Sequence, residues 1–183
     1  MSIDTLIPLA WILLSLAVAG VIFATWSDLK GAPFVTTPQR TIRKMLALAQ
    51  VGPDDVVYDL GSGDGRILFT VAQEYGAKAI GIEIDPLRYL WTRWQIRRKG
   101  LIGQVEVIRQ DMFTVDLSPA SVVTCYLLSE TNLNLMGKLE TELFSGTRIV
   151  SRNFPFPGWP LIAEEPGEKG ETIYCYKLDA TRE

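Results

Sequence analysis

Residues 56–67 read VVYDLGSGDGRI, and this stretch decides which fold the rest of the chain must complete. Five residues of strand type, Val56–Leu60, lead into a loop that holds three glycines in five positions. Because glycine lacks a Cβ atom, such a loop turns sharply and lets a ligand approach its backbone closely. A helical pattern follows at 66–75 and ends at Gly76. The order strand, loop and helix predicts a ligand site at the end of the first strand of an α/β domain.

Strands and helices alternate along the rest of the chain. The periodicity and the turn residues predict helices at 38–50, 66–75, 86–99 and 132–144, and strands at 56–60, 79–84, 105–109, 122–127 and 148–153. Two further strands, joined by a polar turn that contains glycine, follow at the C-terminal end. Strands that alternate with helices build βαβ units. We therefore predict an α/β, Rossmann-like fold with a mostly parallel seven-strand sheet and an antiparallel edge hairpin.

An uncharged stretch of 21 residues, 6–26, precedes this domain. A helix of that length spans about 30 Å, which is the thickness of the hydrocarbon core of a membrane. A cleaved signal peptide is the alternative, because Ala17-Val18-Ala19 matches a cleavage site. Against it, no Lys or Arg precedes the run, and the run continues past that site. We therefore predict one N-terminal transmembrane helix within a membrane anchor at 1–30, followed by a second domain at 31–183.

The charges around this stretch predict an orientation. Only Asp4 and the terminal amine precede it, whereas four basic residues follow it: Lys30, Arg40, Arg43 and Lys44. Positive charge favours the cytoplasmic side of a membrane. We predict a single-pass membrane protein with residues 31–183 on the cytoplasmic side of a bacterial inner membrane. The mitochondrial inner membrane is the alternative, although the N-terminus lacks the Arg- and Ser-rich presequence of imported proteins.

The composition excludes several kinds of chemistry. The chain has 183 residues, a formal net charge of −3 and no histidine. Bulk electrostatics therefore do not favour a nucleic-acid partner. The lack of histidine excludes Ser/His triads and most zinc sites, so we predict no metal. The two cysteines, Cys125 and Cys175, lie in apolar strand-like runs and are expected to be buried free thiols.

The glycine loop fits two kinds of nucleotide site poorly. A dinucleotide fold requires glycine at the position that Arg66 occupies, and no glycine is followed by the Lys-Ser or Lys-Thr of a phosphate-binding P-loop. The pattern is D-x-G-x-G-x-G instead, and its first residue is Asp59. A carboxylate would repel a pyrophosphate, but it suits a ligand that carries an amino group or a positive charge.

Further acidic residues lie at the end of the second predicted strand and after the third. Glu83 is placed to accept both hydroxyls of a ribose, and Asp111 is placed to accept from an adenine amino group, with Met112 packed on the ring. A ribose, an adenine and a cationic tail without phosphates describe S-adenosylmethionine. A solvated loop residue is the alternative for Asp111, and Asp85 is expected to cap a helix. The predicted cofactor contacts from the loop and the strand ends are Asp59, Gly61, Ser62, Gly63, Gly65, Glu83, Asp111 and Met112.

These motifs carry a family resemblance. VVYDLGSGDGRI together with AIGIEID (79–85) is similar to the first motifs of class I, seven-strand methyltransferases. Across residues 33–160, PFVTTPQRTIRKML, YLLSETNLNLMGKLETEL and GTRIVSRNFPFPGW resemble the lysine methyltransferases of ATP-synthase c-subunit and adenine nucleotide translocase, and an archaeal protein-lysine methyltransferase. The resemblance implies an S-adenosylmethionine-dependent methyltransferase domain at 31–183 that acts on lysines of membrane proteins. It also implies that Pro33, Phe34 and Val35 close over the cofactor.

The residues after the fourth predicted strand are expected to border the methyl group. We predict that Leu128 and Phe34 line a narrow apolar channel and that Glu130 orients the incoming amine. A charge that favours a helix N-terminus is the alternative for Glu130. The sequence here is Leu127-Leu128-Ser129-Glu130, without the Asp/Asn-Pro-Pro-aromatic signature of amino-directed DNA methyltransferases, which argues against nucleic acid.

Two other functions are compatible with the same sequence features. The same cofactor residues would serve a methyltransferase for a lipid or another small hydrophobic molecule, or a cofactor-binding scaffold without catalysis.

The predicted helix at 86–99 also has two interpretations. Its apolar stripe of Leu87, Leu90, Trp91 and Trp94 either packs on the sheet beneath a solvated basic face, or the helix contacts an anionic membrane surface.

Overall fold

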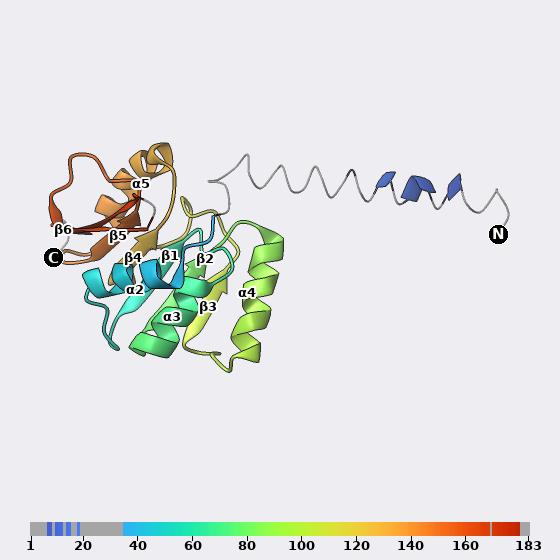
Figure 1. Ribbon diagram of the computed structural model, residues 1–183, viewed down its shortest axis with the longest axis horizontal. Coiled ribbons are helices and arrows are strands. Elements are labelled where there is room, and N and C mark those ends of the chain that lie inside the picture. The colour runs from blue at the N-terminus through green and yellow to red at the C-terminus, as the bar shows by residue number, and fades with distance from the viewer. Residues whose placement is uncertain are drawn as a thin grey trace. The chain divides into compact units, whose positions relative to one another are not determined.

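The computed structural model describes residues 7–8, 10–12, 14–15, 18, 35–168 and 170–179. The chain divides into two units, Met1–Phe34 and Val35–Glu183, and the second holds a seven-stranded sheet in the order β3-β2-β1-β4-β5-β7-β6 (Figure 1). The strands are β1 (Val56–Leu60), β2 (Lys78–Ile82), β3 (Val105–Ile108), β4 (Val122–Cys125), β5 (Arg148–Arg152), β6 (Leu161–Pro166) and β7 (Thr172–Lys177). The helices of this unit are α2 (Gln39–Leu48), α3 (Arg66–Tyr75), α4 (Pro86–Arg98) and α5 (Ser129–Glu142).

The sheet confirms the predicted α/β architecture. Strands β1 to β5 pair in parallel, β7 pairs antiparallel with β5, and β6 pairs antiparallel with β7 at the edge. The parallel strands end at one edge of the sheet, and the loops that follow β1, β2, β3 and β4 meet there. The sheet is therefore Rossmann-like with an antiparallel edge hairpin, and its carboxyl edge is the place for a ligand.

Successive strand residues face two hydrophobic cores, one on each side of the sheet. Val57 and Val122 pack with α2 and α3, whereas Tyr58 and Val123 pack with the apolar face of α5. Because helices cover both faces, the strands read as almost continuous apolar runs. The two cysteines are buried and free, as predicted.

The predicted transmembrane helix at 6–26 is corrected, and with it the predicted single-pass membrane protein on the cytoplasmic side of a membrane. Among the described residues, no helix has the length and the apolar character needed to cross a bilayer. The prediction rested on the length and hydropathy of an uncharged run, and these two properties do not by themselves establish a membrane-spanning helix. Much of that run, including 19–26, lies outside the described residues.

Helix α4 buries a different face from the one that its apolar stripe predicts. Its buried residues are Thr92 and Ile96, which share a face at i and i+4. The whole apolar stripe is exposed, and its members are Leu87, Leu90, Trp91 and Trp94. The interpretation in which this stripe packs on the sheet is therefore wrong.

Candidate active site

The glycine loop follows β1 and is held against the end of β2. The backbone N–H groups of Gly61 and Ser62 both donate to the carbonyl oxygen of Ile82, at 2.9 and 3.0 Å. Gly61, Gly63 and Gly65 all have positive φ angles, of 78°, 56° and 79°. Residues with a Cβ atom rarely adopt this conformation, so the local fold requires the glycines that the sequence provides.

Helix α4 packs against this loop. The Thr92 hydroxyl donates to the carbonyl oxygen of Gly63 at 3.1 Å. A Cβ atom added at Gly65 would lie 2.7 Å from Thr92 Cγ2 and 3.0 Å from the Phe69 ring. The third glycine therefore serves the close packing of α3 and α4 as well as the turn.

We expect Gly65→Ala to destabilise the protein more than Gly100→Ala does. Both glycines have positive φ, but nothing lies within 4 Å of a Cβ atom at Gly100. Backbone strain alone costs roughly 1–2 kcal/mol, and overpacking against Thr92 adds about 1–3 kcal/mol at position 65. Urea unfolding of the two variants measures the difference. Equal losses of unfolding free energy would show that contact with Thr92 does not restrict position 65.

Glu83 follows β2, and its carboxylate is oriented by two backbone groups. Oε2 accepts from the N–H of Gly63 at 2.8 Å, and Oε1 accepts from the N–H of Asp85 at 2.8 Å. The side chain is buried, and this burial raises the pKa of Glu83, while the two backbone hydrogen bonds act in the opposite direction. Each oxygen keeps a further lone pair, so the carboxylate is suited to accept two more hydrogen bonds.

Asp59 lies in β1, and β4 supplies its partner. The Thr124 hydroxyl donates to Asp59 Oδ1 at 2.8 Å, because the parallel register places these two residues opposite each other. The pKa of Asp59 is raised to about 7: burial is the largest cause, the charges of Glu83 and Asp64 add to the increase, and the Thr124 hydrogen bond acts in the opposite direction. A cation bound near this carboxylate would favour its ionised form.

We expect the affinity for S-adenosylmethionine to rise with pH between about 6 and 8. Asp59 has a pKa of about 7 and is therefore mostly protonated at the lower pH, whereas the positively charged cofactor favours the ionised form. If only the ionised form binds, the dissociation constant falls about tenfold over this range. Calorimetric titration at several pH values measures it.

Asp59→Asn is the control for this prediction, because an amide does not titrate. The variant should bind S-adenosylmethionine more weakly and lose most of the pH dependence. An unchanged slope in Asp59→Asn would contradict the assignment to Asp59.

The other predicted cofactor residues lie at the same edge or outside the described residues. Asp111 is exposed, and its Oδ1 accepts from the N–H of Phe113 at 3.0 Å, so this carboxylate also stabilises its own loop. Met112 is half-buried and packs against the hydrophobic core next to α5. Val35 is exposed. Pro33 and Phe34 lie outside the described residues, so their predicted roles stay predictions.

Two predicted catalytic residues, Leu128 and Glu130, lie at the start of α5, which follows β4. Leu128 is exposed immediately before α5, and Glu130 is exposed in its first turn. A Cβ atom at Gly61 would lie 3.4 Å from the side chain of Leu127. Because β4 neighbours β1, the structure brings Leu128 and Glu130 to the part of the edge where Asp59 and the glycine loop lie.

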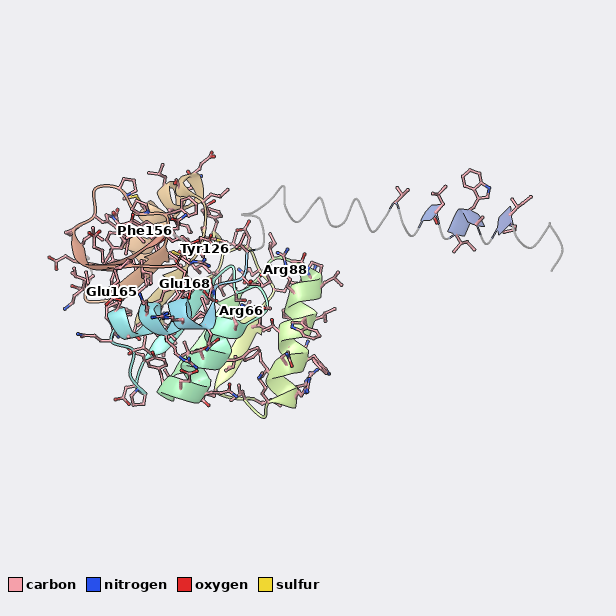
Figure 2. The ribbon with its side chains drawn as sticks, in the orientation of Figure 1. Arg66, Arg88, Tyr126, Phe156, Glu165 and Glu168 are labelled. Carbon is pink, nitrogen blue, oxygen red and sulfur yellow. The ribbon has the colours of Figure 1, made fainter. Side chains whose placement is uncertain are left out.

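A polar cluster that sequence reasoning missed ties the start of α2 to this edge. Arg66 forms an ion pair with Asp64 and donates to the carbonyl oxygen of Thr37 at 3.0 Å. Arg152 donates to the Thr37 hydroxyl at 3.0 Å, and its guanidinium lies 4.1 Å from the centre of the Tyr126 ring. Figure 2 shows Arg66 and Tyr126 in the same region. Thr37, two residues after Val35, is therefore held by both arginines.

Asn132 is a second residue that the sequence did not single out. It is buried in the first turns of α5 and donates to the carbonyl oxygen of Phe154 at 2.8 Å, while its own Oδ1 has no partner. The sequence shows only a polar residue in a helix, and the structure is needed to show that this residue is buried.

The loop after β5 is packed inward: the Phe156 ring stacks on Trp159 and meets Tyr176 edge-on.

The residues at the carboxyl edge fit S-adenosylmethionine. The loop offers backbone without side chains, Glu83 keeps lone pairs for two hydroxyls, and Asp59 offers a carboxylate for a cationic tail. The hydroxyl of Ser62 is buried in the loop without a partner, which leaves it a donor for a ligand. A seven-stranded Rossmann-like sheet with this donor set defines the class of S-adenosylmethionine-dependent methyltransferases.

Comparison with known proteins agrees with this class. The ANTKMT methyltransferase domain matches residues 59–163. A protein-lysine N-methyltransferase of Saccharolobus islandicus is 43% identical over 150 residues, which are 80% of this chain and 93% of the relative. The lysine N-methyltransferase of the ATP synthase c-subunit from Rattus norvegicus is 31% identical, over 82% of this chain and 68% of the relative.

A solved structure supports the same fold and the same cofactor. The crystal structure of an RNA methyltransferase from Salinibacter ruber, in complex with S-adenosyl-L-homocysteine, superposes with a TM-score of 0.76. It is 40% identical to this chain, and the match covers 79% of this chain and 94% of that one. The chain belongs to the ANTKMT methyltransferase family. The predicted methyltransferase activity and the predicted S-adenosylmethionine cofactor are confirmed.

Proposed function

We propose that this chain transfers the methyl group of S-adenosylmethionine to lysine side chains of proteins. The observation that carries the proposal is the carboxyl edge, where Glu83 holds the glycine loop, Asp59 lies in β1, and the start of α5 follows the neighbouring strand β4. The names of the Saccharolobus and rat relatives, which are both lysine N-methyltransferases, support lysine as the acceptor.

The residues of the chain have two tasks in this reaction. The cofactor supplies an electrophilic methyl carbon, and a neutral amine must approach it in line. A lysine amine has an ordinary pKa near 10.4, so an apolar surrounding such as the one Leu128 contributes favours the neutral form that attacks. Glu130 attracts the incoming ammonium before the proton leaves. The C–S bond breaks as the C–N bond forms, and the leaving proton goes to water.

The relatives and the solved structure differ in the acceptor that their names state. The Salinibacter structure is titled an RNA methyltransferase. For this chain the formal net charge of −3 does not favour RNA, and the Saccharolobus relative supports protein. We further propose that the acceptor is a membrane-associated protein. This rests on the names of two relatives: the rat enzyme is named for the ATP synthase c-subunit, and a mouse enzyme is named for adenine nucleotide translocase.

One labelling experiment tests these acceptors together. The purified chain and tritiated-methyl S-adenosylmethionine are added to an extract of cells that lack the protein, and the protein, RNA and lipid fractions are then separated. The Asp59→Ala/Glu83→Ala variant is the control for the cofactor site. Label in a discrete protein band, on lysine by mass spectrometry, supports the proposal. Label only in RNA or only in lipid overturns it, and bound cofactor without any label supports a scaffold without catalysis.

We expect Glu130→Gln to raise the KM for the lysine substrate about five- to tenfold. A carboxylate near a cation at a protein surface contributes about 1 kcal/mol, and the amide loses that charge without changing the shape. The affinity for S-adenosylmethionine should not change. Steady-state kinetics measure both, and Glu106→Gln, at an exposed position of β3, is the matched control. Kinetics of Glu130→Gln that equal those of the wild type would leave Glu130 as a helix-terminal charge only.

A further inference from the structure

The outward face of α4 carries an apolar stripe that is not covered by residues 35–168 or 170–179, which are the described residues of the same unit. Its members recur at i, i+3, i+4 and i+7, and their exposed fractions are 63% for Leu87, 56% for Leu90, 49% for Trp91 and 47% for Trp94. The two indole rings lie 5.2 Å apart, and the guanidinium of Arg98 lies 5.3 Å from the Trp94 ring. This spacing is typical of a helix face that packs against another helix or lies in a groove.

The charges of α4 define the partner. Residues 86–99 contain five basic residues and no acidic one: Arg88, Arg93, Arg97, Arg98 and Lys99. A second copy of the chain would place two such basic helices against each other, which like charge disfavours. Acidic groups that flank an apolar surface complement this face. The two leucines add apolar contact, which a nucleic-acid strand does not need.

The position of α4 connects this face to the reaction. The helix begins at the carboxyl edge, where the N–H of Asp85 donates to Glu83, and Thr92 holds the glycine loop through Gly63. Figure 1 shows α4 outermost in its helical layer, beyond α3 and beside the edge strand β3. A partner on the outward face would therefore extend from the edge where methyl transfer takes place.

We propose that the outward face of α4 is a docking site for the protein substrate, and that it recognises an acidic amphipathic helix of that substrate. The apolar side of the helix packs on Leu90, Trp91 and Trp94, and its acidic side chains pair with Arg97 and Arg98. Docking raises the effective concentration of a lysine near the carboxyl edge. This inference rests on the proposed function, because it takes the acceptor to be a protein.

The test uses the full chain and two synthetic peptides. The first is an amphipathic helix of about 18 residues, with leucine at i, i+3, i+4 and i+7, flanking glutamates and one lysine at its end. The second has glutamine in place of each glutamate. Fluorescence anisotropy measures binding without S-adenosylmethionine, and labelled cofactor measures methylation separately. A loss of methylation with unchanged binding would therefore concern the proposed function and not the docking site.

Two variants of the outward face are compared with a matched control. Leu90→Ser/Trp94→Ser removes apolar contact, and Arg97→Glu/Arg98→Glu reverses charge. Leu133→Ser/Phe144→Ser removes two exposed apolar side chains near α5 instead. We expect each α4 variant to weaken binding of the acidic peptide at least about tenfold and to raise its KM without changing kcat, whereas the control does neither. Affinity should also fall as salt rises from about 0.05 to 0.5 M.

Several results would overturn this inference. Equal affinity for the acidic and neutral peptides, absence of binding, or full binding by the α4 variants would each show that the face does not recognise an acidic helix. Binding of a mixed-sequence RNA, or of phosphatidylglycerol vesicles, that the α4 substitutions abolish while peptide binding persists would assign the face to that partner. Self-association in sedimentation that the same substitutions abolish would assign it to a second copy.

Discussion

Replacement of Glu83 by alanine should weaken the binding of S-adenosylmethionine at least about 100-fold. The carboxylate is fixed by the N–H groups of Gly63 and Asp85, each at 2.8 Å, and this fixes the direction in which its remaining lone pairs point. Loss of hydrogen bonds to a charged acceptor costs about 1.5–3 kcal/mol each, so two ribose hydroxyls account for more than a factor of 100. Calorimetric titration measures the dissociation constant.

The stability of the unliganded Glu83→Ala variant separates binding from folding. Two backbone N–H groups lose their acceptor, which costs about 1–3 kcal/mol each where they stay dry, whereas removal of a buried carboxylate relieves its desolvation. The net loss of unfolding free energy should therefore be smaller than the loss of binding free energy. Glu83→Gln keeps one acceptor oxygen and should bind with intermediate affinity. Glu164→Ala, at an exposed position of β6, is the control, and equal affinity of Glu83→Ala and wild type would exclude Glu83 from the cofactor site.

The sequence predicts elements best where it also marks their ends. The predicted bounds of β1 and α3 coincide with the observed ones, Val56–Leu60 and Arg66–Tyr75. Gly76, with a φ of 71°, ends α3 in the left-handed conformation that favours glycine. The predicted cap at Asp85 is also confirmed, since its side chain accepts from the N–H groups of Leu87 and Arg88. Neighbouring residues determine such boundaries, so a single sequence is enough to predict where these elements begin and end.

Helix α4 shows what periodicity leaves undetermined. Its apolar residues share one face, as the spacing predicts, but the helix turns that face outward. The face that packs inward is selected by Thr92, which bonds to the carbonyl oxygen of Gly63 in a loop 29 residues away. Hydrophobic periodicity states which side chains lie together and does not state whether a partner covers them.

The candidate site likewise combines residues that the sequence predicts with residues that it does not predict. The carboxylates Asp59 and Glu83 could be placed because each lies near the end of a predicted strand. Their polar partners could not, because Thr124 meets Asp59 only through the parallel register of β1 and β4, 65 residues apart in sequence. A threonine in the otherwise apolar strand VVTC was the available signal. Pairing between distant strands depends on the whole sheet and is not specified by any one motif.

Replacement of Arg152 by methionine should reduce the unfolding free energy by about 3–5 kcal/mol. The guanidinium donates to both carboxylate oxygens of Glu171, at 2.7 and 2.9 Å, and to the Thr37 hydroxyl at 3.0 Å. The side chains are only 5% and 18% exposed, so the substitution leaves a carboxylate in a largely dry environment without its counter-ion. For a chain of this size the loss corresponds to a decrease in Tm of roughly 6–20 °C.

An exposed ion pair provides the matched comparison. Arg43 and Glu74 form a similar bidentate pair, but their side chains are 57% and 36% exposed, so Arg43→Met should reduce the unfolding free energy far less than Arg152→Met does. The double variant Arg152→Met/Glu171→Met removes both charges and should regain much of the stability that Arg152→Met loses. Strict additivity of the two single substitutions would contradict this. Because Thr37 contacts both Arg152 and Arg66, Arg152→Met should also weaken S-adenosylmethionine binding, while Arg43→Met should not.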